Sequence, residues 1–222
     1  MFKNIEQPST REYFSELKEG KYDFGVAIYP PEEVREIAKD ILSQIMTKIN
    51  VLNGLDDTHL PHITIFQGGF PKDPSIDLKT LSKQLSGSEL LLQMKQKLSI
   101  SAIGNIFWDA ELSEELMKIH NEALEKFIPI TDGCLMKQWI DRLKGSIGLD
   151  ENAKKRVLTN GFAASGQSFQ PHITLGKLSD ITDEEKIRDI LIPKVSFLAT
   201  NIIGGPLGYA GNIEKIVFDN KE

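Results

Sequence analysis

Cysteine is nearly absent from this sequence, since Cys134 is the single example among 222 residues. One cysteine excludes an internal disulfide and a cysteine-based zinc site, and it is typical of a protein in a reducing compartment. The sequence also lacks any run of the ~20 apolar residues that a membrane-spanning helix needs. Its first residues, MFKNIEQPSTREYF, show neither the basic nor the apolar region of a secretion signal. We therefore expect a cytoplasmic protein with no membrane partner.

An excess of positive charge is missing as well, because 32 acidic residues outnumber 26 basic ones and give a net charge of −6. Proteins that hold long nucleic acid by its phosphates are usually basic. We therefore expect no extended nucleic-acid footprint, and a ligand of that kind would be small or held at one phosphate. The hydrophobic fraction of 40% is that of an ordinary globular protein with a substantial core. We expect a monomer with one domain over residues 1–222.

Strand and helix patterns alternate along the chain in two halves. Alternating or β-branched segments predict strands, apolar residues at helical spacing predict helices, and Gly or Pro clusters separate them. Residues 134–160 have helical character without a strand pattern, and we interpret them as an insertion or a lid. Strands are predicted at 22–29, 60–66, 90–108, 170–176, 194–203 and 213–219, helices at 32–50, 75–86, 112–127 and 182–191, and glycine-rich turns at 67–71 and 204–211.

One short pattern occurs twice, as Pro61-His62-Ile63-Thr64 and as Pro171-His172-Ile173-Thr174, each followed by an aliphatic residue. Side chains two residues apart share one face of a β-strand. Each copy therefore places one imidazole and one hydroxyl on one face and apolar side chains on the other. An internal duplication accounts for the repetition, and it predicts two lobes with helices outside and sheets facing inward.

Two such strands carry what the cleavage of a phosphodiester needs when no metal takes part. Imidazole titrates near neutral pH, so a pair of histidines supplies a base for the nucleophile and an acid for the leaving oxygen. A threonine hydroxyl on the same face can donate to a non-bridging phosphoryl oxygen. If the two strands face each other across a groove, one histidine lies on each side of the phosphorus.

The paired motifs resemble the two His-x-Thr-x signatures of the 2H phosphoesterase superfamily, which includes bacterial 2′-5′ RNA ligase-like proteins and cyclic nucleotide phosphodiesterases. The resemblance covers most of the chain and is weakest at the N-terminus and around the helical segment. It implies a bilobal, duplicated α+β fold with two antiparallel-rich sheets that line a central cleft. It also implies chemistry without a metal or other cofactor, in which His62 and His172 are acid and base and Thr64 and Thr174 hold the phosphate. Which histidine has which role stays open.

Aromatic residues near the motifs are candidates for stacking on a base of the substrate. They stand next to motif strands or glycine turns, where the mouth of a cleft would lie: Phe70, Phe169 and Tyr209. One such contact is worth ~1–3 kcal/mol. A ring packed beneath a loop is at least as common, so both interpretations stay open.

The other two histidines are weaker candidates. His120 lies beside the apolar stripe of a predicted helix, where a packed or capping histidine is more common than a catalytic one. His59 precedes His62 by three residues, which on a strand would be the opposite face, and we expect it in the loop that leads to the first motif, where contact with a substrate is the less common role. No Asp, Glu or Cys cluster completes a zinc site with these residues, so we expect no metal.

The sequence therefore predicts a phosphoric diester hydrolase that uses two histidines and no metal. Its substrate would be a small nucleotide phosphodiester, such as a 2′,3′-cyclic phosphate or a short or cyclic oligonucleotide. Two alternatives stay open: a binding module that captures a nucleotide or an RNA end without turnover, and a 2′-5′ RNA ligase.

Overall fold

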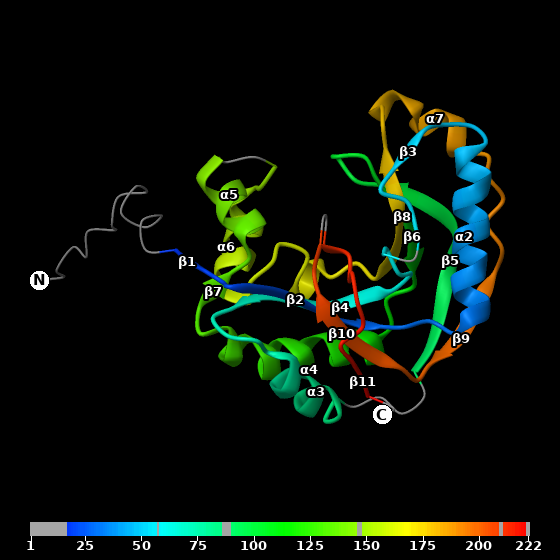
Figure 1. The fold of residues 1–222 in the computed structure, drawn as a ribbon. Helices are drawn as coiled ribbons and strands as arrows, with labels where there is room; N and C mark the ends of the chain where they lie inside the picture. The colour runs from blue at the N-terminus through cyan, green and yellow to red at the C-terminus, as the bar shows by residue number, and fades with distance from the viewer. Residues whose placement is uncertain (1–16, 57, 86–89, 146–147, 209–210, 221–222) are drawn as a thin grey trace, which may run out of the picture.

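The computed structural model describes residues 17–56, 58–85, 90–145, 148–208 and 211–220 (Figure 1). Helices and strands alternate through both halves of the chain. In chain order they are β1 (Lys18–Glu19), β2 (Tyr22–Ile28), α2 (Glu32–Met46), β3 (Val51–Leu52), β4 (Ile63–Phe70), α3 (Ser75–Ser82), β5 (Leu90–Ile100), β6 (Asn105–Ala110), α4 (Glu114–Thr131), β7 (Cys134–Leu135), α5 (Lys137–Gly145), α6 (Glu151–Asn160), the 3-10 turn η1 (Gly166–Ser168), β8 (His172–Leu178), the 3-10 turn η2 (Ile181–Asp183), α7 (Glu184–Ile187), β9 (Val195–Ala199), β10 (Ile202–Pro206) and β11 (Phe218–Asp219).

Within the described residues, nine strands form one curled antiparallel sheet in the order β11-β10-β2-β4-β8-β6-β5-β9, with β3 beside β8. Each motif strand has a long partner in its own half, since β2 pairs with β4 and β6 pairs with β8. The halves meet where β4 and β8 pair through one pair of residues, Ile63 and Ile173. The duplicated, antiparallel α+β fold is thus confirmed, and the two predicted sheets are joined edge to edge at this point.

The two long helices each cover the half of the sheet that they do not follow in sequence. α2 comes after β2 yet packs against β8, and α4 comes after β6 yet packs along β4. Figure 1 shows α2 beside β5 and β9, and α4 on the side of β4. Helical spacing buries one apolar stripe of α2, which consists of Val34, Ala38, Ile41, Leu42 and Ile45. Each half therefore needs the helix of the other half to cover its apolar face.

Two glycine-rich segments that the sequence predicts as turns belong to strands. Residues 67–70 continue β4, and residues 204–206 are part of β10. A Cβ atom on Gly69 would lie 2.5 Å from the carbonyl oxygen of Leu135 in β7, which is too close for any other residue. The turn prediction was wrong for residues 67–70 and 204–206, because glycines in these strands serve close packing between segments and glycine composition alone does not distinguish that from a turn.

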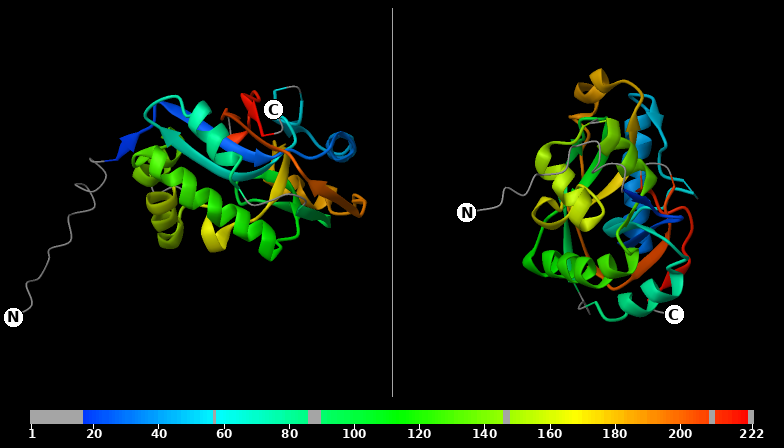
Figure 2. Two further views of the ribbon diagram at one scale, coloured as in Figure 1. Left: turned by 90° about the horizontal axis from the view of Figure 1, so that it is seen from below. Right: turned by 90° about the vertical axis from the view of Figure 1, so that its left-hand side faces the viewer.

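The segment 134–160 begins with β7, which pairs in parallel with β1, and continues as α5 and α6. Figures 1 and 2 show both helices at the end of the molecule where β1 and β7 lie. Trp139, Leu143 and Val157 anchor the two helices in the main core. A role of this segment as a lid stays a prediction. Among the described residues, no helix is long and apolar enough to cross a membrane.

Because α2 packs against β8 and α4 packs along β4, each half of the sheet depends on a helix from the other half, and we expect the two halves to unfold together. Trp108 on β6 and Trp139 on α5 are the two tryptophans of the chain, so single-tryptophan variants report on different elements. In both Trp108→Phe and Trp139→Phe, denaturant unfolding followed by fluorescence should coincide with unfolding followed by far-UV circular dichroism. A fluorescence transition that clearly precedes the other signal in either variant would show that one half unfolds alone.

Candidate active site

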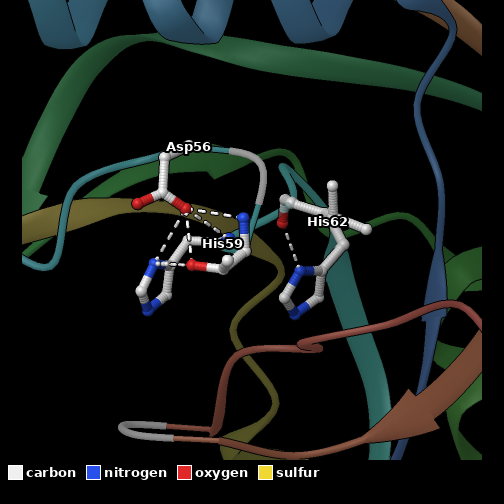
Figure 3. Close-up of polar contacts among 5 residues, drawn as sticks. Asp56, His59 and His62 are labelled. Carbon is white, nitrogen blue, oxygen red and sulfur yellow. Dashed lines mark hydrogen bonds and ion pairs between the residues drawn. The ribbon is translucent and has the colours of Figure 1, made fainter.

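Each motif histidine has its ring fixed by a hydrogen bond to the backbone two residues before it. Nδ1 of His62 donates to the carbonyl oxygen of Leu60 at 2.7 Å, and Nδ1 of His172 donates to the carbonyl oxygen of Gln170 at 2.7 Å. A carbonyl oxygen only accepts, so Nδ1 carries the hydrogen in both neutral rings and Nε2 is left to take or give a proton. Figure 3 shows the ring of His62 held in this way. The same local geometry thus prepares both imidazoles for proton transfer.

The joint between β4 and β8 brings the two motifs together. The central isoleucines of the motifs lie opposite each other in an antiparallel pair, and both are fully buried. The register therefore sets His62 across from Thr174, and Thr64 across from His172, all on the face opposite to the isoleucines. Two pairs of side chains that are far apart in sequence therefore share one small area of the sheet.

A β-bulge follows the threonine in both motifs. The pairing of β4 with β2 skips Ile65, and the pairing of β8 with β6 skips Leu175. A bulge re-aims the side chains that follow it, so Gln67 and Lys177 return to the face of the histidines, and both are half-buried. No local sequence signal marks these two residues, because strict alternation from the threonine would turn them toward the core. Lys177 brings a positive charge to the face that carries the motif threonines.

Burial favours the neutral form of both motif imidazoles. His62 is 6% exposed, and burial lowers its pKa to about 4, against the opposing effect of the hydrogen bond to Leu60. The positive charge of a protonated His172 lowers the pKa of His62 further. Burial also lowers the pKa of His172, while the Gln170 hydrogen bond and the carboxylate of Asp109 act in the opposite direction. Both Nε2 atoms are therefore free of protons near neutral pH in the free protein.

His172 has further neighbours on the adjoining strands. Asp109 of β6 is its cross-strand partner, and the centroid of the Phe107 ring lies 3.9 Å from that of the imidazole. The carboxylate of Asp109 accepts a hydrogen bond from Oγ of Ser99 on β5 at 3.0 Å. No sequence signal marks these residues, because β6 carries no motif and its register with β8 is a property of the fold.

His120 has a structural role. Its fully buried ring donates from Nδ1 to the carbonyl oxygen of Ile65 at 2.8 Å, and its Nε2 accepts from the backbone N–H of Gly166 at 2.9 Å. The ring also stacks on Phe169, with 4.0 Å between centroids. Burial lowers the pKa of His120, and both ring nitrogens are already bonded. His120 thus ties the bulge of the first motif to the loop that precedes the second.

Two of the aromatic residues predicted to stack on a base lie in the core instead. Phe70 is fully buried with its ring 6.3 Å from that of Phe66, and Phe169 is 4% exposed against His120. The stacking prediction is wrong for both, because neither ring is accessible to a ligand. Tyr209 lies outside the described residues, so its role stays a prediction.

His59 lies in the loop that precedes β4, as the sequence predicts. Oδ1 of Asp56 organises this loop by accepting from the backbone N–H groups of Thr58 and His59 and from the Thr58 hydroxyl, which lowers the pKa of Asp56 to about 2. Nδ1 of His59 lies 3.2 Å from the same oxygen. Figure 3 shows the rings of His59 and His62 turned toward the same side. The part of the chain that the structure describes contains no cluster of three or more His, Cys, Asp or Glu residues suited to a metal ion.

The bonds of His120 predict a large loss of stability in His120→Ala. The carbonyl group of Ile65 and the N–H group of Gly166 would lose their partners inside the protein, and each unpaired group costs about 1–3 kcal/mol. We expect the free energy of unfolding in urea to fall by about 2–5 kcal/mol. His59→Ala, at a partly exposed position, is the matched control and should change it by less than about 0.5 kcal/mol. Equal stability of the two variants would rule out this role of His120.

Comparisons with known proteins support the fold and give no sequence relative. No family model matches the chain, and no curated protein matches it. TT0787 of Thermus thermophilus aligns with 89% of this chain and 96% of its own length, at 15% identity and a TM-score of 0.56. E. coli LigT complexed with 3′-AMP aligns with 89% of this chain and 96% of its own length, at 14% identity and a TM-score of 0.51. LigT complexed with NADP+ aligns with 90% of this chain and 97% of its own length, at 12% identity and a TM-score of 0.50. The similarity to these solved structures covers 89–90% of the chain and concerns its fold.

Proposed function

We propose that this protein is a metal-independent phosphodiesterase that acts on a small nucleotide phosphodiester, with His62 and His172 as its acid and base. The observation that carries the proposal is the joint between β4 and β8. It sets two imidazoles of the same tautomer on one face of the sheet, each across from a threonine of the other motif. An acid and a base on two adjacent strands suit a reaction in which the nucleophile attacks phosphorus from one side and the leaving oxygen departs on the other.

Hydrolysis of a 2′,3′-cyclic phosphate would use these groups as follows. One Nε2 takes a proton from water while the water oxygen forms a bond to phosphorus. The bond from phosphorus to one ribose oxygen breaks, its electron pair goes to that oxygen, and the other Nε2–H gives it a proton. The product is a ribonucleoside monophosphate, and the histidines exchange their protons with solvent before the next turnover.

The phosphoryl group itself needs donors for its non-bridging oxygens. The hydroxyl groups of Thr64 and Thr174 share the face of the histidines and can donate to these oxygens. Lys177, returned to this face by the second bulge, adds a positive charge. Because the bound phosphate is an anion, it favours protonation of one imidazole at the moment of binding.

A nucleotide of small size agrees with what is known of the structural relatives and with the charge of the chain. E. coli LigT has been solved in complex with 3′-AMP and with NADP+, two small nucleotides. The net charge of −6 disfavours a long nucleic-acid partner. A 2′,3′-cyclic phosphate or a short or cyclic oligonucleotide is therefore the substrate class that we propose.

A panel of phosphodiesters followed by phosphorus NMR tests the proposal. We expect the resonance of a 2′,3′-cyclic nucleotide, or of a short or cyclic oligonucleotide, to be replaced by that of a monoester, with an equal rate in EDTA. Loss of turnover on chelation would contradict the metal-independent mechanism. Binding of a panel member without a new phosphorus resonance would favour the binding module, and joining of RNA ends would favour the ligase.

Substitution of the motif residues should remove activity and leave the fold intact. His62→Ala and His172→Ala should each lower kcat/KM by about 10²–10⁴-fold, the usual contribution of an acid or a base. Thr64→Val and Thr174→Val should each lower kcat by about 10²-fold, because a donor to the phosphoryl oxygens is lost. Thr80→Val, at an exposed position on α3, is the matched control and should retain full activity. Activity near that of the wild type in either histidine variant would disprove the two-histidine mechanism.

The pH dependence follows from the lowered pKa values of the two imidazoles. Activity needs one ring protonated and the other neutral, and the pKa of His62 is about 4 while that of His172 is also lowered from 6.5. We therefore expect kcat/KM to reach its maximum at a pH between the pKa of His62 and the pKa of His172. Below this range kcat/KM falls because the base is protonated, and above it kcat/KM falls because the acid loses its proton. Rates that keep rising into the alkaline range would be inconsistent with this pair.

A further inference from the structure

The two motif histidines are alike in tautomer and in threonine partner, so these features do not separate the acid from the base. The difference lies in the residue beside each histidine on the neighbouring strand. Asp109 of β6 is the cross-strand partner of His172. In the first half, the pairing of β2 with β4 ends at Ile28 and Ile63, so the position that corresponds to Asp109 is Tyr29, the residue directly after β2.

The side chain of Asp109 is fixed beside the His172 ring. Cross-strand partners in an antiparallel pair have their Cβ atoms about 4.5–5.5 Å apart. Oγ of Ser99 fixes the carboxylate by donating to Oδ1 at 3.0 Å, and the ring of Phe107 lies against the imidazole with 3.9 Å between centroids. A fixed negative charge at this range favours the protonated imidazole.

The neighbour of His62 has the opposite character. Tyr29 carries no carboxylate, and its hydroxyl oxygen accepts a hydrogen bond from Nη1 of Arg35 at 2.6 Å. The guanidinium group of Arg35 also lies over the Tyr29 ring, 4.4 Å from its centroid. His62 is also the more deeply buried of the two motif histidines. Burial lowers its pKa most, and the charge of a protonated His172 acts in the same direction, so the neutral imidazole is favoured.

We propose that Asp109 is a positioning residue that makes His172 the general acid and leaves His62 as the general base. The inference rests on the proposed function, because it assigns roles within the same site. Asp109 acts through the ring of His172 and does not touch the reacting atoms.

The charges around His172 agree with this assignment. The carboxylate of Asp109 on β6 acts on the imidazole of His172 through its charge, and His62 on β4 is coupled to His172 in the same way. Burial lowers the pKa of both motif imidazoles, but the carboxylate opposes this effect at His172 and not at His62. A protonated His172 lowers the pKa of His62 in turn. When the site holds a single proton, the proton resides on His172.

The roles give a balanced reaction. Nε2 of His62 takes a proton from water while the water oxygen bonds to phosphorus. The bond between phosphorus and the departing ribose oxygen breaks, and Nε2–H of His172 protonates that oxygen. His62 ends protonated and His172 neutral, and solvent restores the starting state.

NMR titration of the histidine ring nitrogens in the free protein tests the effect of Asp109 independently of any substrate. Asp109→Asn should lower the pKa of His172 by about one unit and shift that of His62 much less, whereas Asp109→Glu should restore most of the wild-type value. Asp40→Asn, at an exposed position on α2, removes the same charge and should shift neither ring. Ser99→Ala should produce a smaller shift of the same sign, which keeps the test decisive if Asp109→Asn does not fold. An unshifted His172, or a larger shift at His62, overturns the proposal.

The residual activities of the two histidine variants on a 2′,3′-cyclic nucleotide test the acid and base roles. His172→Ala retains the base, so its residual rate should rise with pH through the pKa of His62 and then stay constant. His62→Ala retains the acid, so its residual rate should fall as pH rises through the pKa of His172. Reversed or pH-independent profiles overturn the assignment. If the wild type hydrolyses no diester, the proposed function fails, and the NMR titration still decides whether Asp109 favours protonation of His172.

Discussion

The contact on which the site depends is the pairing of β4 with β8 at the centre of the sheet. Among the strand pairs of the described residues, this is the pair that sets one motif beside the other. The two isoleucines at the joint are fully buried, so the side chains next to them are forced onto the opposite face. A slip of one residue would turn the histidines into the core. The hydrophobic effect thus fixes the register, and the register places the side chains of the two motifs on one face of the sheet.

The rest of the fold keeps this joint rigid. α2 and α4 each cover the half to which the other belongs by sequence, so neither half buries its apolar face without its counterpart. His120 also connects the two halves, through hydrogen bonds instead of apolar contacts. A bulge leaves one residue outside the regular ladder, and His120 satisfies the carbonyl group of that residue in the first motif while it holds Gly166 before the second. The burial that makes this architecture stable also lowers the pKa values of the imidazoles, so stability and reactivity have a common origin.

The sequence was sufficient for the parts of the site that follow from local periodicity. The histidines and threonines of the motifs share a face because strand side chains alternate, and their repetition predicted the two related halves. The sequence was insufficient for residues whose position depends on a contact between distant segments. Lys177 reaches the site only because a bulge breaks the alternation, and Asp109 reaches His172 only through the register of β6 with β8. Phe70 and Phe169 were placed wrongly because a ring at the mouth of a cleft and a ring beneath a loop have the same local sequence signals.

The central claim is that the two motifs form one site, and ligand binding followed at the histidine rings tests it most directly. 3′-AMP, which E. coli LigT holds in its solved complex, can be titrated into protein with nitrogen-labelled histidine. The account predicts that the Nε2 resonances of His62 and His172 move together and saturate with one dissociation constant, while those of His120 stay in place. Movement of only one of the two motif histidines, or saturation with two different constants, would contradict it.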